Sequence, residues 1–347
     1  MKHIKTVVLS AHIFLNFSTN PIQFDPNSNI TTISDPSTDV DHVYLFAHGL
    51  AATRRQATSM FSYVTDEFSP SKYNQNWIVK NPLVIFDFPD AKNDEKIEWH
   101  GDKVNLGQDL DICTLASAFV KTKELFPNKP IVLGGVSRGA ATILNYVGTA
   151  KPHNIAAIVL ESPFDSLRSV ILHLLRQYYI SWIPFSEALA IKYMTSIFPL
   201  LNMEGISPIQ VAHAIPTSIP ILFVHSKEDK VVPISASRRL YVQLRQAGHN
   251  NVYLFELATG EHARLARGPE AGLYHQIVQS FYKKYGLPHE THAATFGDQI
   301  LKYCQPAPDD VRKKLTHKKK KKIALEIKKN FLDVFLQYKT NTFLQVS

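Results

Sequence analysis

The chain lacks long apolar runs and has almost no cysteine. No stretch of about 18 consecutive apolar residues occurs, so an ordinary membrane-spanning helix is not expected. The two cysteines, Cys113 and Cys304, are far apart in the sequence, which indicates neither a disulfide framework nor a zinc site. Stability must therefore come from an apolar core, and 347 residues with 45% apolar content are enough to build one.

The body of the chain also lacks an excess of charge of either sign. The formal net charge is +8, but residues 312–329 contain ten lysines and arginines and one glutamate, a local charge of +9. The remaining residues therefore carry −1 in total. Because the basic character belongs to a tail, the high isoelectric point does not predict a nucleic-acid-binding body.

What the sequence does contain is a series of strand-length apolar runs. Most are continuous rather than alternating, which is typical of strands buried on both faces of a parallel sheet. Helix-like stretches separate them, so the pattern predicts an α/β fold with a mostly parallel central sheet, flanking helices and right-handed crossovers. The predicted strands are residues 42–47, 82–88, 130–136, 155–160, 220–225 and 251–257, and the predicted helices are 104–126, 138–149, 236–247 and 270–285.

Three segments depart from this alternation. Residues 1–39 are interpreted either as a poor signal peptide or as a first strand, since His12 interrupts the apolar stretch and no clear cleavage site follows. Residues 165–219 are helical and aromatic-rich, and form either a lid over the carboxyl-terminal edge of the sheet or a helical pair packed on the core. Residues 288–347 are polar and then basic, and follow the α/β domain predicted for residues 40–287.

The basic tail has an apolar pattern of its own. Ile323, Ile327 and Phe331 recur at helical spacing on one face, among lysines. One interpretation is a docked or solvated helix. The other is a basic amphipathic element, residues 312–338, at an anionic membrane surface. Nucleic acid is not an expected partner.

Residues 131–142, IVLGGVSRGAAT, place a serine in a glycine-rich turn. Gly134 and Gly139 have the spacing of a phosphate-binding loop, but alanines occupy the positions of its lysine and hydroxyl residue. The dinucleotide pattern G-x-G-x-x-G also fails, because a valine replaces its second glycine. The pattern G-x-S-x-G does fit, at Gly135, Ser137 and Gly139, between a predicted strand and a predicted helix.

That context gives the serine a chemical role. A sharp strand-to-helix turn strains the backbone and exposes the hydroxyl, and small residues on both sides let strand and helix approach each other. The N–H of Arg138 then lies at the helix N-terminus, where it can hold an oxyanion. The turn therefore predicts Ser137 as a nucleophile, which requires an acid and then a histidine further along the chain.

The acid and base candidates follow two later strands. Asp229 lies in the polar loop after residues 220–225, and His262 follows the next strand, 33 residues later, which leaves room for one helix and one strand. His225 precedes Asp229 and breaks the required order. The alternatives for the acid are the neighbouring Glu228 and, less well placed, Glu161 and Asp165.

The first long strand ends in the dipeptide His48-Gly49. The chain turns there, where a second oxyanion donor is required, and the N–H of Leu50 is the expected donor. His48 itself is expected to be structural.

Together these motifs resemble those of the α/β-hydrolase superfamily over residues 40–287. The resemblance is carried by HGLAA, GGVSRGAA, HSKEDKVVP and GEHARL, and VLESPFDSLRSV (159–170) is similar to the matching segment of intracellular-type esterases and prolyl-oligopeptidase-like hydrolases. Those families usually have His-Gly before the acid loop, where this chain has His225-Ser226. Only about 40 residues precede the first strand, so we do not expect the propeller of dedicated prolyl oligopeptidases.

The resemblance implies the α/β-hydrolase fold with a helical lid-like insertion, and a serine hydrolase that needs no cofactor or metal. Its expected substrate is a small molecule with a carboxylic ester, thioester or related acyl bond. A serine peptidase of the same fold and a non-catalytic binding scaffold are the alternatives. The implied site comprises Ser137, Asp229 and His262 as the triad, the N–H groups of Leu50 and Arg138 as the oxyanion hole, and His48, Gly49, Gly135 and Gly139 as supporting positions.

Overall fold

A computed structural model of the chain describes residues 22–24, 30–33, 41–54, 56–57, 82–91 and 101–308. The N-terminal apolar stretch and the amphipathic tail helix predicted from the sequence lie outside these residues. Within them, no helix has both the length and the apolar character needed to cross a membrane.

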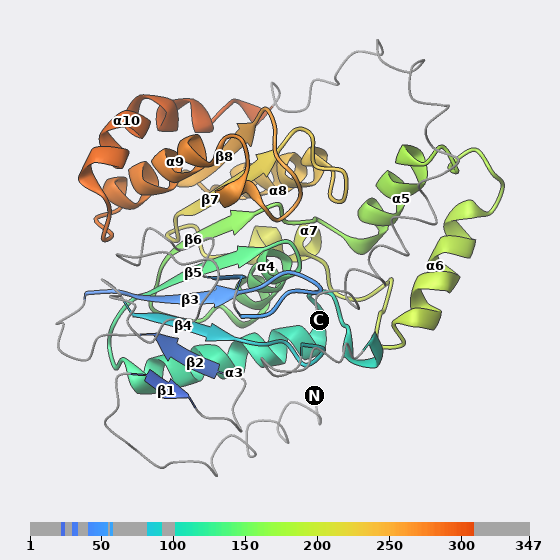
Figure 1. The fold of residues 1–347 in the computed structure, drawn as a ribbon, viewed down its shortest axis with the longest axis horizontal. Helices are drawn as coiled ribbons and strands as arrows, with labels where there is room; N and C mark the ends of the chain where they lie inside the picture. The colour runs from blue at the N-terminus through green and yellow to red at the C-terminus, as the bar shows by residue number, and fades with distance from the viewer. Residues whose placement is uncertain are drawn as a thin grey trace, which may run out of the picture.

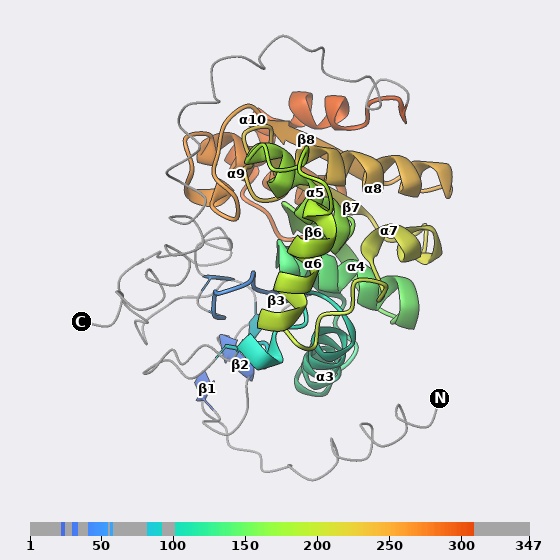
Figure 2. The same cartoon turned by 90° about the vertical axis from the view of Figure 1, so that its right-hand side faces the viewer.

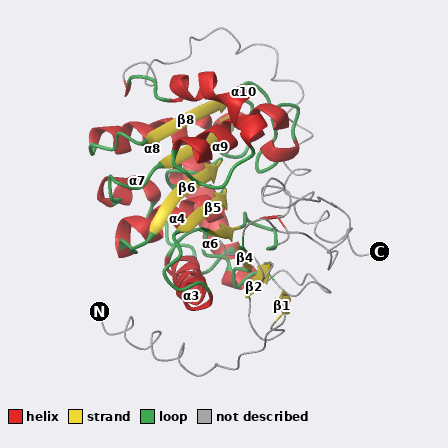
Figure 3. Cartoon of the chain, turned by 90° about the vertical axis from the view of Figure 1, so that its left-hand side faces the viewer, coloured by secondary structure: helices red, strands yellow, loops and turns green. Residues whose placement is uncertain are grey.

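One eight-stranded sheet forms the centre of the molecule (Figures 1 and 3). Its strand order is β1-β2-β4-β3-β5-β6-β7-β8, with parallel pairing from β4 to β8 and antiparallel pairing of β1 and β2 at one edge. All six strands predicted from the apolar runs are confirmed. The strands are β1 Ile22–Phe24, β2 Ile30–Ile33, β3 Val43–Ala47, β4 Leu83–Phe86, β5 Ile131–Val136, β6 Ile155–Glu161, β7 Ile221–Ser226 and β8 Val252–Leu257.

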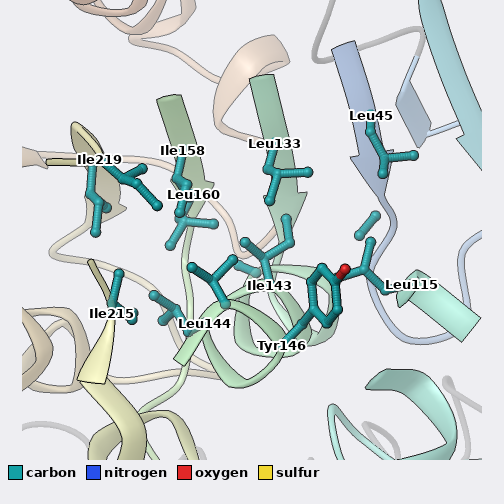
Figure 4. Packing of buried hydrophobic residues seen from close by; sticks show 14 of the residues in the cluster. Leu45, Leu115, Leu133, Ile143, Leu144, Tyr146, Ile158, Leu160, Ile215 and Ile219 are labelled. Carbon is teal, nitrogen blue, oxygen red and sulfur yellow. The ribbon is translucent and has the colours of Figure 1, made fainter. Parts of the chain in front are cut away.

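Apolar clusters cover both faces of this sheet. Every residue of β3, β4, β5 and β7 is buried, which explains why their sequences are continuously apolar. On one face, side chains such as Leu133 and Ile158 pack against Ile143, Leu144 and Tyr146 (Figure 4). The helices on that face are α3 Asp109–Leu125, α4 Arg138–Ala150 and α8 Ile234–Gln246, and those on the other are α9 Ala271–Lys284 and α10 Thr291–Leu301.

A helical insertion separates β6 from β7. Figures 1 and 2 show its first two helices, α5 Leu167–Gln177 and α6 Ser186–Ile197, beyond the carboxyl ends of the strands. A small apolar cluster attaches the insertion to the body: Leu167, Phe198 and Leu201 are buried together with Val232. The insertion then ends in α7 Pro208–Val211 and the short helix η2 Ala212–Ala214; the other short helices of the described chain are η1 Gly101–Lys103, η3 Leu265–Arg267 and η4 Lys302–Cys304.

The folded body continues past residue 287, into the segment that the sequence assigned to the tail. Helix α10 packs along α9, and Ser280 Oγ donates to the Ala294 carbonyl across this contact, 2.7 Å away. Gly297 allows the close approach, because a Cβ there would overlap Ser280 Oγ and the Gln276 carbonyl oxygen. At least residues 291–304 therefore belong to the packed structure.

Replacing Gly297 by alanine should lower the free energy of unfolding by about 1–3 kcal/mol, because the added methyl group must push α9 and α10 apart. Urea denaturation measures the loss. Gly272→Ala in α9 is the matched control, since nothing lies within 4 Å of its Cβ. The control should be neutral or slightly stabilising; equal destabilisation by both changes would contradict the close contact.

A buried carboxyl group at the end of β6 gives the fold a pH dependence. Glu161 is fully buried, and its Oε1 accepts a hydrogen bond from the Leu265 N–H, 3.0 Å away. Burial raises the pKa of Glu161 to about 7, although that hydrogen bond opposes the shift. Between the ordinary pKa and this value, the folded chain binds a proton that the unfolded chain has lost, so stability falls as the pH rises from about 5 to 7.

The change Glu161→Gln should remove this loss. We expect the stability of the variant relative to the unmodified protein to rise by about 2–3 kcal/mol between pH 5 and pH 8. Urea denaturation at a series of pH values measures it, with Glu204→Gln, at an exposed residue, as the control. A stability difference that does not change with pH would show that Glu161 does not titrate in this range.

Candidate active site

Ser137 lies between β5 and α4 in a strained conformation. Its φ of 51° is in the left-handed region, which non-glycine residues rarely adopt. The Ser137 N–H donates to the Glu161 carbonyl oxygen at 2.8 Å, which fixes the turn to β6. Although Ser137 stands at the N-cap position of α4, its side chain makes no capping hydrogen bond, so the hydroxyl is available for other contacts.

The two glycines of the motif let three backbone segments meet at this turn. A Cβ on Gly139 would overlap the carbonyl groups of Ala47 and His48 at the end of β3. A Cβ on Gly135 would lie 2.9 Å from the Ala140 nitrogen. Larger residues would therefore move α4 away from the sheet and release the strained serine.

Three residues from three strand ends form a continuous chain of hydrogen bonds. His262 Nε2 lies 2.8 Å from Ser137 Oγ, and His262 Nδ1 lies 2.7 Å from Asp229 Oδ2. A single ring proton satisfies both contacts: Nδ1–H donates to the carboxylate, and Nε2 accepts from the serine hydroxyl. The residues are up to 125 positions apart in sequence, and the parallel sheet brings them to one edge.

The carboxylate of Asp229 is held by four donors. Its Oδ1 accepts from the N–H groups of Val231 and Val232, each 2.9 Å away. Its Oδ2 accepts a hydrogen bond from His262 Nδ1 and also lies 3.2 Å from His225 Nε2. Burial by itself would raise the pKa of Asp229, but the hydrogen bonds from His225 and His262 outweigh it and lower the pKa well below its ordinary value. Asp229 is therefore charged at neutral pH.

The other acidic candidates face elsewhere. Glu228 is exposed, and Asp165 forms a short ion pair with Arg239, 2.5 Å away, across the base of the insertion. Glu161 is buried and accepts from the Leu265 backbone. None of these three carboxyl groups lies at hydrogen-bond distance from the His262 ring in the described structure.

The turn after β3 lies against the serine. A Cβ on Gly49 would be 3.8 Å from the Cβ of Ser137. The Gly49 N–H donates to Gln56 Oε1 at 2.7 Å, whereas nothing in the described residues accepts a hydrogen bond from the Leu50 N–H. Arg138 is the first residue of α4, and its N–H has no acceptor within the helix. Among the described residues, no acceptor is therefore found for either N–H group.

His48 fixes this turn as a neutral residue. Its Nδ1–H donates to the Gly49 carbonyl at 2.8 Å, and its Nε2 accepts from the Phe88 N–H at 3.1 Å. Burial, assisted by the nearby Arg138 guanidinium, lowers the pKa of His48 to about 3. The ring therefore connects β3 to the end of β4, and no hydrogen bond joins it to Ser137 in the described residues.

Two side chains near the triad make contacts that were not predicted from the sequence. The Arg138 side chain points into the interior, where it pairs with Asp90 at 2.6 Å and Asp111 at 3.3 Å and lies over the Phe88 ring. His225 was set aside because it precedes the acid, yet it contacts that acid directly. Its position at the end of β7, four residues before Asp229, is a signal that could have suggested this contact.

The described residues contain no group of three or more histidine, cysteine, aspartate or glutamate side chains arranged to hold a metal ion. What the site offers is a hydroxyl, an imidazole and a carboxylate in line. Such an arrangement can move a proton off the hydroxyl and thereby make it a nucleophile.

Comparisons with known proteins agree with this topology. Residues 102–286 match the model of the prolyl oligopeptidase family, which is more than half of the chain. The uncharacterized protein YqkD of Bacillus subtilis (strain 168) is 29% identical over 155 residues, 44% of this chain, and the match spans only about half (47%) of that protein's length.

Solved structures show a similar fold at low sequence identity. The esterase Pf2001 of Pyrococcus furiosus superposes with a TM-score of 0.53 and 17% identity, covering 76% of this chain and 89% of that chain. MGS-MChE2, an α/β-hydrolase from a sediment metagenome of the Mar Chica lagoon, covers 77% of this chain and all of its own, with 14% identity and a TM-score of 0.46. The protein is thus an α/β-hydrolase in fold, and by its family match it belongs to the prolyl oligopeptidase family.

Proposed function

We propose that this protein is a serine hydrolase that cleaves a carboxylic ester, thioester or related acyl bond through an acyl-enzyme on Ser137. The observation that carries the proposal is the hydrogen-bond chain from Ser137 Oγ through the His262 ring to Asp229. Membership of a hydrolase family supports it. A binding scaffold without activity would not require a strained serine at φ 51° with both partners in place.

In the proposed reaction, Ser137 Oγ attacks the acyl carbonyl carbon while its proton moves to His262 Nε2. The tetrahedral adduct collapses, the bond to the leaving group breaks, and His262 returns the proton to that group. Water then repeats the sequence on the acyl-serine and releases the acid. Asp229 orients the imidazole and stabilises its charged form, and the low pKa of this aspartate keeps the carboxylate ionised throughout.

The proposed oxyanion donors are the N–H groups of Arg138 and Leu50. Arg138 begins a 13-residue helix, so the helix dipole adds positive potential at the same place. The buried ion pairs of the Arg138 side chain hold this helix end in position. Such donors typically contribute a few kcal/mol each to stabilising the transition state.

The surroundings of the triad favour an apolar acyl group. Leu50 follows the glycine that lies against Ser137, and the Val231 N–H donates to Asp229. Both side chains are partly buried against the cluster that includes Leu167 of α5. We propose that residues 165–219 act as a lid that completes this apolar boundary. A peptide substrate is the second candidate, because the family match includes peptidases by name.

The assignment of the acid is tested by a matched pair of variants. With a p-nitrophenyl ester, Asp229→Asn should lower kcat by about 10³–10⁴-fold, because the imidazole loses its anionic partner and its fixed tautomer. Glu228→Gln changes an exposed neighbour and should leave kcat within about twofold. If Glu228→Gln is the more damaging change, the acid has been assigned wrongly.

A substrate panel separates the two candidate bonds. We expect p-nitrophenyl esters of short and medium acyl chains to give kcat/KM values at least about 100-fold above those of aminoacyl and prolyl p-nitroanilides. Ser137→Ala serves as the blank for both series. Higher values for the anilides would replace the esterase proposal with a peptidase.

A further inference from the structure

Exposed apolar side chains gather on one part of the insertion. Nine large apolar residues are exposed in the described part of the chain, and seven of them lie between residues 179 and 200. Trp182 is 78% exposed and Phe185 is 82% exposed. The remaining two, Val120 and Tyr303, lie elsewhere on the surface. Because isolated exposed apolar residues are ordinary but a contiguous group is not, this concentration requires an explanation.

Six of these seven side chains belong to the α5–α6 hairpin, which we define as α5, α6 and the turn of residues 178–185 between them. Leu189 and Tyr193 are four residues apart and therefore lie on the same side of α6, while Trp182 and Phe185 lie in the turn directly before this helix. Met194, by contrast, packs against the cluster that attaches the insertion to the body. The hairpin therefore has an anchored inner side and an apolar outer side.

The turn presents its aromatic residues at a cost in backbone energy. Tyr179 and Phe185 both have positive φ, 53° and 62°, although neither is glycine. For bulky side chains this region is unfavourable by about 1–3 kcal/mol. Phe185 gains no burial in return, since it is the most exposed of the large apolar residues. Strain without compensating burial is typical of a segment shaped for binding.

The charged side chains of the hairpin are mostly basic. Glu187 is the only acidic residue between residues 166 and 203, and it pairs with Arg168 at 2.7 Å. Arg176 of α5 and Lys192 of α6 are exposed on the same hairpin. Tryptophan, tyrosine and phenylalanine with neighbouring cations is the composition of segments that lie among lipid headgroups.

We propose that the outer side of the α5–α6 hairpin docks on the surface of a lipid bilayer. Its shape supports this partner, because α5 and α6 stand out from the body as a ridge (Figures 1 and 2), and a ridge can insert between headgroups. A second copy of this chain fits a ridge less well, because a stable dimer generally needs a broad face of about 800 Å² on each copy. The inner side of the hairpin joins the cluster that includes Leu50 and Val231, so docking would place the triad close to the membrane.

This interaction goes beyond the proposed hydrolysis and does not depend on it. Binding should be the same for Ser137→Ala, whose nucleophile is absent. A failure of vesicle binding would thus leave the proposed function untouched, and an inactive protein could still bind vesicles.

The test uses the full chain and sedimentation with phosphatidylcholine vesicles, which carry no net charge. The double variant Trp182→Ser with Phe185→Ser should bind at least about tenfold more weakly than the unmodified protein. The control is Val120→Ser with Tyr303→Ser, which removes two exposed apolar residues outside the hairpin and should bind normally. Circular dichroism and thermal unfolding verify that both variants are folded. Equal binding by the two double variants, or no binding by the unmodified protein, would overturn the proposal.

Two further measurements separate other sources of binding. On vesicles with phosphatidylglycerol, any contribution of the lysine-rich residues 312–329 should fall steeply with added salt, while the difference caused by Trp182 and Phe185 should persist. Sedimentation velocity without lipid should show the same oligomeric state for all variants. A hairpin variant that dissociates an oligomer and leaves vesicle binding unchanged would contradict the proposal and indicate a second copy as the partner.

Discussion

The close approach of α4 to the ends of β3 and β5 is the constraint on which the site depends. Only glycine fits at position 139, because any Cβ would overlap the Ala47 and His48 carbonyls. This contact holds Ser137 at positive φ between the strand and the helix. The same packing places the N–H of Arg138 at the helix start and the turn of Gly49 beside the serine. Backbone geometry, rather than any single side chain, therefore assembles the proposed nucleophile and its oxyanion donors.

A second constraint on the site is the accumulation of donors on one carboxylate. Two backbone N–H groups and two histidines converge on Asp229, which is why its charge persists despite burial. His225 lies at the end of β7, where related families usually have the sequence His-Gly. In this chain the histidine is present and serine replaces the glycine. By contrast, burial of the nearby Glu161 outweighs the hydrogen bond from the Leu265 N–H and raises the pKa of this carboxyl group. The surroundings of the two carboxyl groups thus shift their pKa values in opposite directions: Asp229 stays charged, whereas the pKa of Glu161 is about 7.

Much of this architecture could be predicted from the sequence because its signals are local. Continuous apolar runs gave all six parallel strands, and small residues around a serine predicted the turn before α4. The interior position of the Arg138 side chain could not be predicted, since Asp90 and Asp111 are distant in sequence and the pairing depends on how three segments pack. The packing of α10 could not be predicted for the same reason. Position 297 requires glycine because the Gln276 backbone of α9 lies close to it, and the sequence does not show that contact. Long-range packing, not residue type, decides such contacts.

The central claim is that Ser137 is a nucleophile activated by His262, and an active-site fluorophosphonate tests it most directly. The reagent should form one adduct per chain, which peptide mass spectrometry should locate on Ser137, and the protein with His262→Ala should react at a small fraction of the rate. An adduct on another serine, or a folded protein that does not react, would contradict the account.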